Sequence, residues 1–287
     1  HKGFIMRINT NVSSLTAQEA AKNTNSSISS SLEKLSTGLK INKASDDASG
    51  LAIADKLRTQ VTSINQGVAN GNSAITLLQI ADKSMAEQSK ILDTVKSKLI
   101  QANTATTSSD GRESIRKDIT KLLEQLDNIA QQTNYNGTYL LQADAASGAA
   151  ASTAHTFQIG EKTSDMITMS AVRANTAGLT LTALAGLATS GLTTTVAQTG
   201  QGSVDAAITT LNGYRGDIGS TQNQVESAVR NLMTQSTNIK NAESVLRDVD
   251  YAEESANFNK LNIISQAGSY AISQSNAVSQ NVLRLLQ

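Results

Sequence analysis

The adjacent residues Asp46 and Asp47 are a first candidate for chemistry, either as a metal-binding carboxylate pair or as an acid–base pair. Neighbouring residues on a helix point in different directions, so these carboxylates would not converge on one atom. Ser45 or Asp46 suits the N-cap of a helix, where negative charge also favours the helix dipole. Gly38 stands where a glycine ends a preceding helix. We therefore expect a joint between two helices rather than a reactive site.

Other candidates for catalysis or metal binding are few. The sequence has no cysteine, and its two histidines, His1 and His155, belong to no recognised ligand spacing. These residues provide neither a nucleophile–base pair nor a phosphate-binding glycine pattern. Glu253 and Glu254 are expected to form a charged link between helices. We expect no enzymatic activity, no metal and no cofactor.

The composition favours long helices over a compact globular core. Among 287 residues there is no proline, aromatic residues make up 3%, and the formal net charge is zero. The absence of proline leaves long helices uninterrupted, and the charge balance gives no electrostatic reason to bind nucleic acid or an anionic membrane. We expect no membrane-spanning segment and no cleaved secretory signal, and we assign no role to the five residues before Met6.

Apolar residues recur at alternating steps of four and three along much of the chain. The pattern is longest from Leu57 to Leu99 and from Val204 to Leu246. A third run consists of Ile115, Ile119, Leu122, Leu126 and Ile129. This spacing indicates helices packed lengthwise on one another. We predict a mostly α fold, a long antiparallel coiled-coil-like helical bundle with paired terminal helices and a small β-hairpin region.

The two ends of the chain have weaker seams than the middle. Each end is amphipathic, yet it has too little apolar surface to hold itself, so we expect it to fold on meeting copies or partners. We predict that assembly and packing depend on Leu32, Leu35, Gly38, Leu39, Asp46, Asp47, Leu261, Ile264, Val278, Val282 and Leu285.

Residues 143–200 are rich in Ala, Gly, Ser and Thr. The stretches "TFQIG" and "DMITMSAV" predict a β-hairpin, and the rest is expected to be solvent-exposed loop with one short apolar strand or helix. "NYNG" at 134–137 predicts a turn. Candidate O-glycosylation acceptors, among which the sequence does not choose, are Ser152, Thr153, Thr156, Ser190 and Thr193.

Several segments resemble bacterial flagellins and follow the order of that family. They are "MRINTNVSSL", "LEKLSTGLKINKASDDASGLAIADKLR", "ANGNSAITLLQIAD", "IAQQTNYNGTYLL", "YRGDIGSTQNQVESAVRNL" and "NVLRLLQ". The resemblance is close for residues 6–142 and 201–287, and the short middle lacks the large outer domains of many flagellins. The pattern is more similar to flagellins of the Campylobacter–Helicobacter type.

The resemblance implies a structural subunit that polymerises into the bacterial flagellar filament for swimming motility. Terminal helices in residues 1–47 and 249–287 would form the inner filament core. Residues 48–142 and 201–248 would form a long-helix bundle domain, and residues 143–200 a short β and loop region facing solvent. The alternative is a hook–filament junction protein, although such proteins usually have a larger middle and a less exact version of "STGLKINKASDDASGLAIAD".

The resemblance also implies partners and a route out of the cell. These are export by the flagellar type III route, an extracellular location, an export chaperone on residues 250–287, and contacts with hook-associated and cap proteins. Residues 91–103 lack the arginine-bearing pattern of flagellins recognised by the vertebrate innate receptor, which argues against recognition. In its place stand Asp93, Thr94, Lys96, Ser97 and Lys98.

Overall fold

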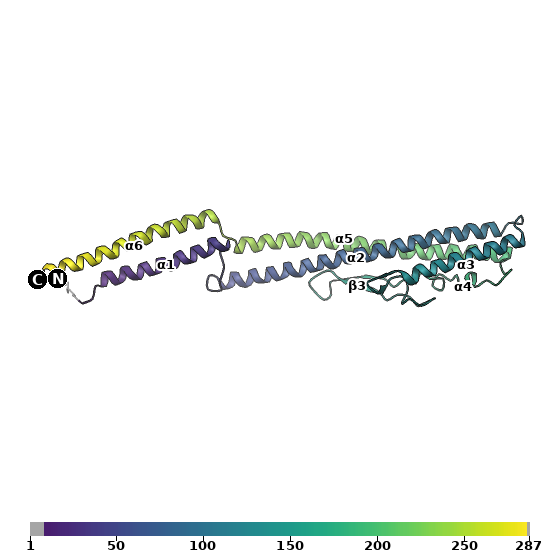
Figure 1. Ribbon diagram of the computed structural model, residues 1–287, viewed down its shortest axis with the longest axis horizontal. Coiled ribbons are helices and arrows are strands. Elements are labelled where there is room, and N and C mark those ends of the chain that lie inside the picture. The colour runs from purple at the N-terminus through teal and green to yellow at the C-terminus, as the bar shows by residue number, and fades with distance from the viewer. Residues whose placement is uncertain (1–8, 286–287) are drawn as a thin grey trace. The chain divides into compact units, whose positions relative to one another are not determined.

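The computed structural model describes residues 9–285 and is mostly helical, which confirms the predicted fold class (Figure 1). The helices are α1 (Val12–Thr37), α2 (Ala48–Ala102), α3 (Ser109–Gln132), α4 (Thr182–Ala185), α5 (Thr194–Arg247) and α6 (Tyr251–Leu285). The strands are β1 (Asn134–Tyr135), β2 (Thr138–Tyr139), β3 (His155–Gln158) and β4 (Met166–Met169). The first residues of "MRINTNVSSL" and the last two of "NVLRLLQ" lie outside the described residues.

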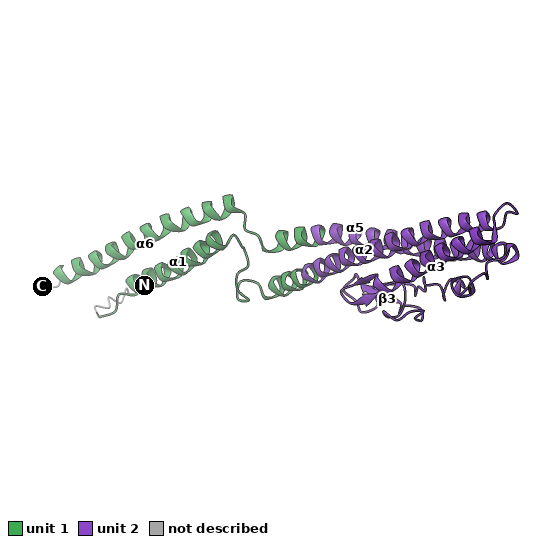
Figure 2. Cartoon of the chain, turned by 45° about the vertical axis from the view of Figure 1, so that its right-hand side comes forward, with its two compact units in different colours: residues 1–60, 238–287 green, residues 61–237 purple. Residues whose placement is uncertain are grey.

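The chain divides into two compact units, which are described separately (Figure 2). Unit 1 comprises the described part of residues 1–60 and 238–287, and unit 2 comprises residues 61–237. No helix within residues 9–285 is both long and apolar enough to cross a membrane.

In unit 2, α2 and α5 lie side by side in antiparallel order (Figure 1). The Arg215 Nε donates to Asp82 Oδ1 over 2.8 Å, and Lys96 forms an ion pair with Asp205. The later residue of α2 thus pairs with the earlier residue of α5, as expected for two antiparallel helices. The predicted seam of α5 is confirmed at its buried members Val204, Leu211, Ile218, Val225, Val229, Leu232 and Ser236.

Two glycines of α2 let neighbouring segments approach its backbone. A Cβ atom on Gly67 would lie 1.9 Å from the carbonyl oxygen of Ile159, and one on Gly71 would lie 2.3 Å from a methyl group of Val229. Gly67 thus admits the loop after β3, and Gly71 admits α5.

The third helix starts where its local sequence directs it, but its seam differs from the prediction. The Ser108 hydroxyl accepts a hydrogen bond from the Gly111 N–H over 3.0 Å and so caps α3. The buried residues are Ile115, Ile119, Leu123, Leu126 and Ala130, whereas the predicted Leu122 and Ile129 are half-buried. The spacing did not distinguish Leu122 from Leu123, because a second segment, from residues 143–200, also packs on this helix and widens its buried face.

Both predicted β features are confirmed. The strands β3 and β4 are antiparallel, with Phe157 opposite Ile167. The "NYNG" turn joins β1 to β2, and its central residues Asn136 and Gly137 have φ values of 51° and 81°. Positive φ at both central positions is what a type I′ hairpin turn requires.

The segment 143–200 contributes to the core of unit 2 as well as to its surface. Its buried apolar residues include Ile159, Ile167, Met169, Val172, Leu179, Leu181, Leu184 and Leu192. The Asp127 carboxylate of α3 accepts hydrogen bonds from the N–H and the hydroxyl of Thr176, each 2.7 Å long. The Arg116 guanidinium donates to the carbonyl oxygen of Leu187 over 3.0 Å. Polar groups on α3 therefore hold a segment that composition alone suggested was loop.

Candidate assembly surface

Gly38 ends α1 as predicted. Its φ is 73°, in the left-handed region that suits glycine, and its N–H donates to the carbonyl oxygen of Lys34 over 2.9 Å. The Thr37 hydroxyl accepts a hydrogen bond from the Leu39 N–H over 3.2 Å. The chain therefore leaves the helix at a defined angle.

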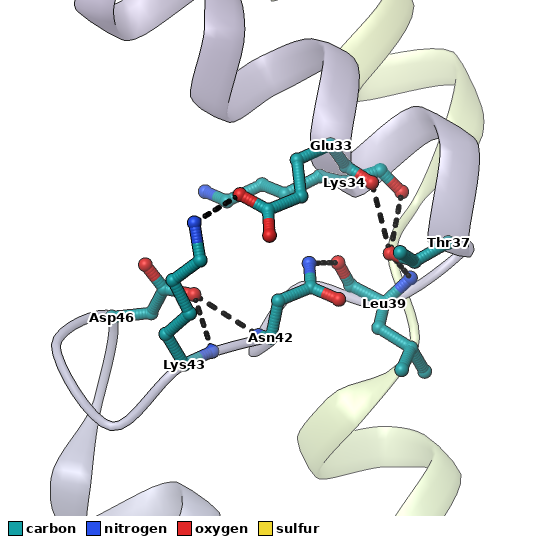
Figure 3. Close-up of polar contacts among 7 residues, drawn as sticks. All are labelled: Glu33, Lys34, Thr37, Leu39, Asn42, Lys43 and Asp46. Atoms are coloured by element: carbon teal, nitrogen blue, oxygen red, sulfur yellow. Dashed lines mark hydrogen bonds and ion pairs between the residues drawn. The ribbon is translucent and has the colours of Figure 1, made fainter.

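Asp46 and Asp47 have different structural roles, and neither suggests catalysis. The Asp46 Oδ2 accepts hydrogen bonds from the N–H groups of Asn42, at 3.0 Å, and Lys43, at 2.9 Å (Figure 3). The bond from Lys43 is the largest cause that holds the pKa of Asp46 below its usual range, and the bond from Asn42 is the second. The Asp47 Oδ1 accepts from the Gly50 N–H over 2.9 Å. Asp47 is thus the N-cap of α2; the prediction of Ser45 or Asp46 was wrong because the Asp46 carboxylate closes the preceding turn.

An ion pair spans the same joint. The Lys43 ammonium lies 2.7 Å from Glu33 Oε2 on α1 (Figure 3). The hydrogen bond from Lys43 to Glu33 is the largest cause that raises the pKa of Lys43, and the negative charge of Glu33 is the second. Both groups face solvent, so the pair contributes little to stability, but it links the end of α1 to the turn that follows.

The two chain segments that connect helices in unit 1 are bonded to each other. The Lys40 N–H donates to the carbonyl oxygen of Arg247 over 2.6 Å, and the Val249 N–H donates to that of Gly38 over 3.0 Å. A Cβ atom on Gly38 would lie 2.9 Å from the Tyr251 hydroxyl. The joint is therefore a short antiparallel pairing of the two connectors.

The most buried side chains in the contact between α1 and α6 are polar. The helices lie side by side (Figures 1 and 2), and the buried residues of α1 are Ser14 and Ser31. Within Tyr251–Leu285, α6 has no buried residue. The Ser14 hydroxyl donates to Asn276 Oδ1 over 2.9 Å, and the Ser31 hydroxyl donates to Glu254 Oε1. The bond from Ser31, as the largest cause, lowers the pKa of Glu254.

Large apolar side chains of this helix pair face outward. Val278 is 55% exposed and Leu285 is 87% exposed. The exposed apolar residues of the pair also include Val12, Leu15, Leu32, Tyr251, Ile263, Ile264, Tyr270 and Leu283. A single chain therefore leaves uncovered the surface that a helix of this type would normally bury.

The structure separates the predicted assembly residues into two groups. Leu35, Leu39, Leu261 and Val282 are half-buried, whereas Leu32, Ile264, Val278 and Leu285 are exposed. The predicted seam of α6 is thus divided between a side that meets α1 and a side that faces solvent. Their role in assembly stays a prediction.

The candidate glycosylation acceptors also differ in accessibility. Ser152 is buried, and its hydroxyl accepts a hydrogen bond from the Val172 N–H over 2.9 Å. The other four hydroxyl residues, Thr153, Thr156, Ser190 and Thr193, are exposed. Their modification stays a prediction, with Ser152 the least accessible of the five.

Among the described residues, no group of three or more His, Asp or Glu is placed to hold a metal ion. His155 lies in β3 with its Nε2 3.3 Å from the carbonyl oxygen of Tyr139, and His1 lies outside the described residues.

Sequence reasoning missed the polar residues that fix segments on one another. Ser31 lies three residues after Ile28 and four before Leu35, so this spacing was a signal that it lies on the contact face of α1. Ser14 has no large apolar residue at either spacing and gave no such signal. Glu113 and Arg116 were also missed. Their positions three residues apart predict a local pair but do not reveal that both also bond to the segment 187–190.

Comparison with known proteins identifies the family. Residues 8–146 match the bacterial flagellin N-terminal helical region, and residues 202–286 match the bacterial flagellin C-terminal helical region. Flagellin from Bacillus subtilis is 33% identical over 98% of this chain and 100% of its own length. The flagellar filament 33 kDa core protein of Treponema phagedenis is 32% identical over the same shares of the two chains.

Flagellin B of Helicobacter pylori is more similar over a shorter stretch. It is 46% identical over 166 residues, which are 56% of this chain and 32% of the relative. The chain thus aligns with about a third of that protein, but with the full length of the Bacillus and Treponema proteins. It belongs to the bacterial flagellin family, whose members are structural, non-enzymatic subunits that polymerise into the extracellular flagellar filament and serve motility.

Proposed function

We propose that this flagellin enters its filament through the outward faces of α1 and α6. Residues 1–47 and 249–287 would form the inner filament core, residues 48–142 and 201–248 the surrounding bundle, and residues 143–200 would contribute the outer surface. The observation that carries the proposal is the absence of any buried residue in α6 within Tyr251–Leu285, although that helix bears several large apolar side chains.

The energetics support assembly at this surface. Fully burying one large aliphatic side chain stabilises a complex by about 1.5–3 kcal/mol relative to leaving it exposed. Ile263, Tyr270 and Val278 follow one another at steps of seven and eight residues, so they lie along one side of α6. Covering this stripe with neighbouring copies would supply the free energy of apolar burial that α6 lacks in the single chain.

The test is seeded polymerisation of the full chain carrying Val278→Asp. A charge in a buried contact is costly, so we expect filament growth to stop, while the helicity of the free chain changes little because Val278 is exposed there. The matched control is Gln280→Asp, which is also at an exposed position on the same helix but replaces no apolar side chain. Normal growth of Val278→Asp filaments would refute this assembly surface.

We also propose that residues 250–287 bind a flagellin export chaperone before assembly and that the chain leaves the cell by the flagellar type III route. The same exposed apolar residues support this, because an uncovered stripe would otherwise associate prematurely. Contacts with hook-associated and cap proteins would use the same ends. Equal binding of a purified flagellin chaperone to the full chain and to a chain lacking residues 250–287 would contradict the proposal.

We further propose that the vertebrate innate flagellin receptor responds weakly to this protein. In α2, Lys96 pairs with Asp205, and Lys98 lies 3.0 Å from Asp118. These cations are engaged within the chain and do not reproduce an arginine-bearing surface. Receptor reporter cells should respond less to this flagellin than to one with the arginine pattern, and a chimera carrying that pattern at residues 91–103 should restore the response. A full response to the unaltered chain would contradict the proposal.

A further inference from the structure

The apolar residues of the terminal helix pair do not by themselves specify how α6 is placed along α1. Half-buried Leu261 and Val282 of α6 belong to a repeating pattern of apolar and small residues. A helix with such a repeat can slide by seven residues and present a similar face to its partner. A contact that distinguishes one register from another must therefore come from residues whose type is not repeated seven positions away along α6.

Polar contacts between the two helices have this property. Near one end of the pair, Ser14 donates to the side-chain Oδ1 of Asn276 over 2.9 Å. The neighbouring bond from Asn11 Nδ2 to the backbone carbonyl oxygen of Ser275, 3.2 Å long, adds to this contact but does not distinguish registers, because every residue has such a carbonyl. Near the other end, Ser31 donates to Glu254 Oε1. These contacts bracket most of the length over which the helices lie together.

The burial of the two serines makes these contacts decisive. Ser31 is 2% exposed and Ser14 is 6% exposed, so neither hydroxyl can exchange its partner for bulk water. A buried hydroxyl left without a partner is destabilising, and the hydrogen bond to a charged acceptor is stronger than one between neutral groups. A slide of α6 by one heptad would separate Glu254 and Asn276 from the serines.

We propose that Ser31–Glu254 and Ser14–Asn276 are positioning pairs that fix the register of α6 on α1. They act as single polar residues do in coiled coils, where specificity of alignment is obtained at a cost in stability. A fixed register also determines how far along α1 the exposed side chains Ile263, Tyr270 and Val278 are placed. The pairs thus define the surface offered to a neighbouring copy.

The lack of cysteine in this chain allows a direct measurement of register by engineered disulfides. Asn25 and Ser265 face each other midway along the pair, with their side-chain oxygens 3.4 Å apart. The full chain with Asn25→Cys and Ser265→Cys reports the observed register. Chains pairing Asn25→Cys with Phe258→Cys or with Ile272→Cys report a slide of one heptad in either direction. Gel mobility separates cross-links within one chain from those between chains.

We expect the 25–265 cross-link to dominate over both shifted ones in the otherwise unaltered chain. Adding Ser31→Ala with Glu254→Leu should lower the native-to-shifted ratio about tenfold, the scale of one buried hydrogen bond to a charged group. Glu254→Gln should preserve the ratio, because its amide oxygen still accepts from Ser31. Ser14→Ala with Asn276→Leu provides an independent variant at the other end, and circular dichroism checks that each variant keeps its helicity.

An unchanged ratio in both double variants would overturn the proposal. So would a Glu254→Gln chain that loses register as fully as the chain with Ser31→Ala and Glu254→Leu, because the hydrogen bond would then not be the cause. The measurement is made within single chains and does not require α1 and α6 to be the assembly surface. Failure of that proposed function would instead appear as normal polymerisation of Val278→Asp.

Discussion

At the residue scale, Gly38 shows how local chemistry fixes a turn that assembly would depend on. Its positive φ is available to glycine without strain, and the Tyr251 hydroxyl lies close to where a Cβ would project. A side chain here would act on the path of the connector rather than on the helices it joins.

Gly38→Val should therefore disturb filament assembly much more than the helicity of the free chain. A β-branched residue at positive φ costs about 1–3 kcal/mol, which the chain can relieve by altering the joint. Filament yield after seeding, compared with far-UV circular dichroism, measures the two effects. Gly38→Asn is the control, since asparagine tolerates this conformation better. Equal yields for Gly38→Val and the unaltered chain would remove the role assigned to Gly38.

Glu113 gives a residue-scale prediction about pH. The Arg116 guanidinium, and then the Ser190 N–H at 2.8 Å, lower the pKa of Glu113 from 4.5 to about 2. A lowered pKa in the folded chain means that this stabilisation is fully present above the unfolded-state pKa. It is lost as the pH falls from about 4.5 through about 2.

We expect Glu113→Gln to lower the melting temperature at neutral pH, and the difference from the unaltered chain to shrink as the pH falls through that window. Thermal unfolding followed at several pH values checks this. The matched control is Glu124→Gln, whose carboxylate pairs with Lys121 on the exposed side of the same helix. A difference that grows towards acid pH would contradict the assigned ion pair.

Residue-level prediction succeeded where the signal was local. Gly38 could be identified because few residues adopt its conformation, and the "NYNG" turn for the same reason. The N-cap of α2 was misplaced by one or two residues because Ser45, Asp46 and Asp47 are all suitable caps. Only the folded turn, in which Asp46 binds two N–H groups, leaves Asp47 for the helix.

At the element scale, the long helices pack through apolar seams, whose spacing is visible in the sequence. They also pack through close backbone contacts at glycines, which the sequence does not reveal. The periodicity of α5 predicted most of its buried residues between Val204 and Ser236, although Ala207 is buried there and the predicted Ile208 is half-buried. In α3 the buried residue is Leu123 rather than Leu122, because that helix also carries the segment 143–200. In α6 the seam contacts only one helix, so half of its residues stay exposed.

Gly67→Ala should destabilise unit 2 by about 1–3 kcal/mol, because the new methyl group would displace the Ile159 backbone. Gly219→Ala is the matched control. It lies in α5, where an added methyl group would have no neighbouring atom within 4 Å, and it should stabilise the chain by about 0.4–1 kcal/mol. Denaturant unfolding of both variants measures the contrast, and two variants of similar stability would contradict the close approach at Gly67.

At the scale of the whole molecule, burial is distributed unequally. Unit 2 contains nearly all of the large buried side chains, including Leu78, Met85, Leu92, Leu123 and Leu140. The α1–α6 pair of unit 1 instead buries two serines and leaves many of its large apolar residues exposed. The stability of the single chain thus rests mainly on unit 2, whereas the terminal helices require neighbours to bury their apolar surface.

A helical reconstruction of the filament tests this account most directly. We predict that Ile263, Tyr270 and Val278 of each copy are covered by neighbouring copies and lose most of the exposure they have in the single chain. A filament in which these three side chains still face water, with contacts between copies confined to α2 and α5, would contradict the account.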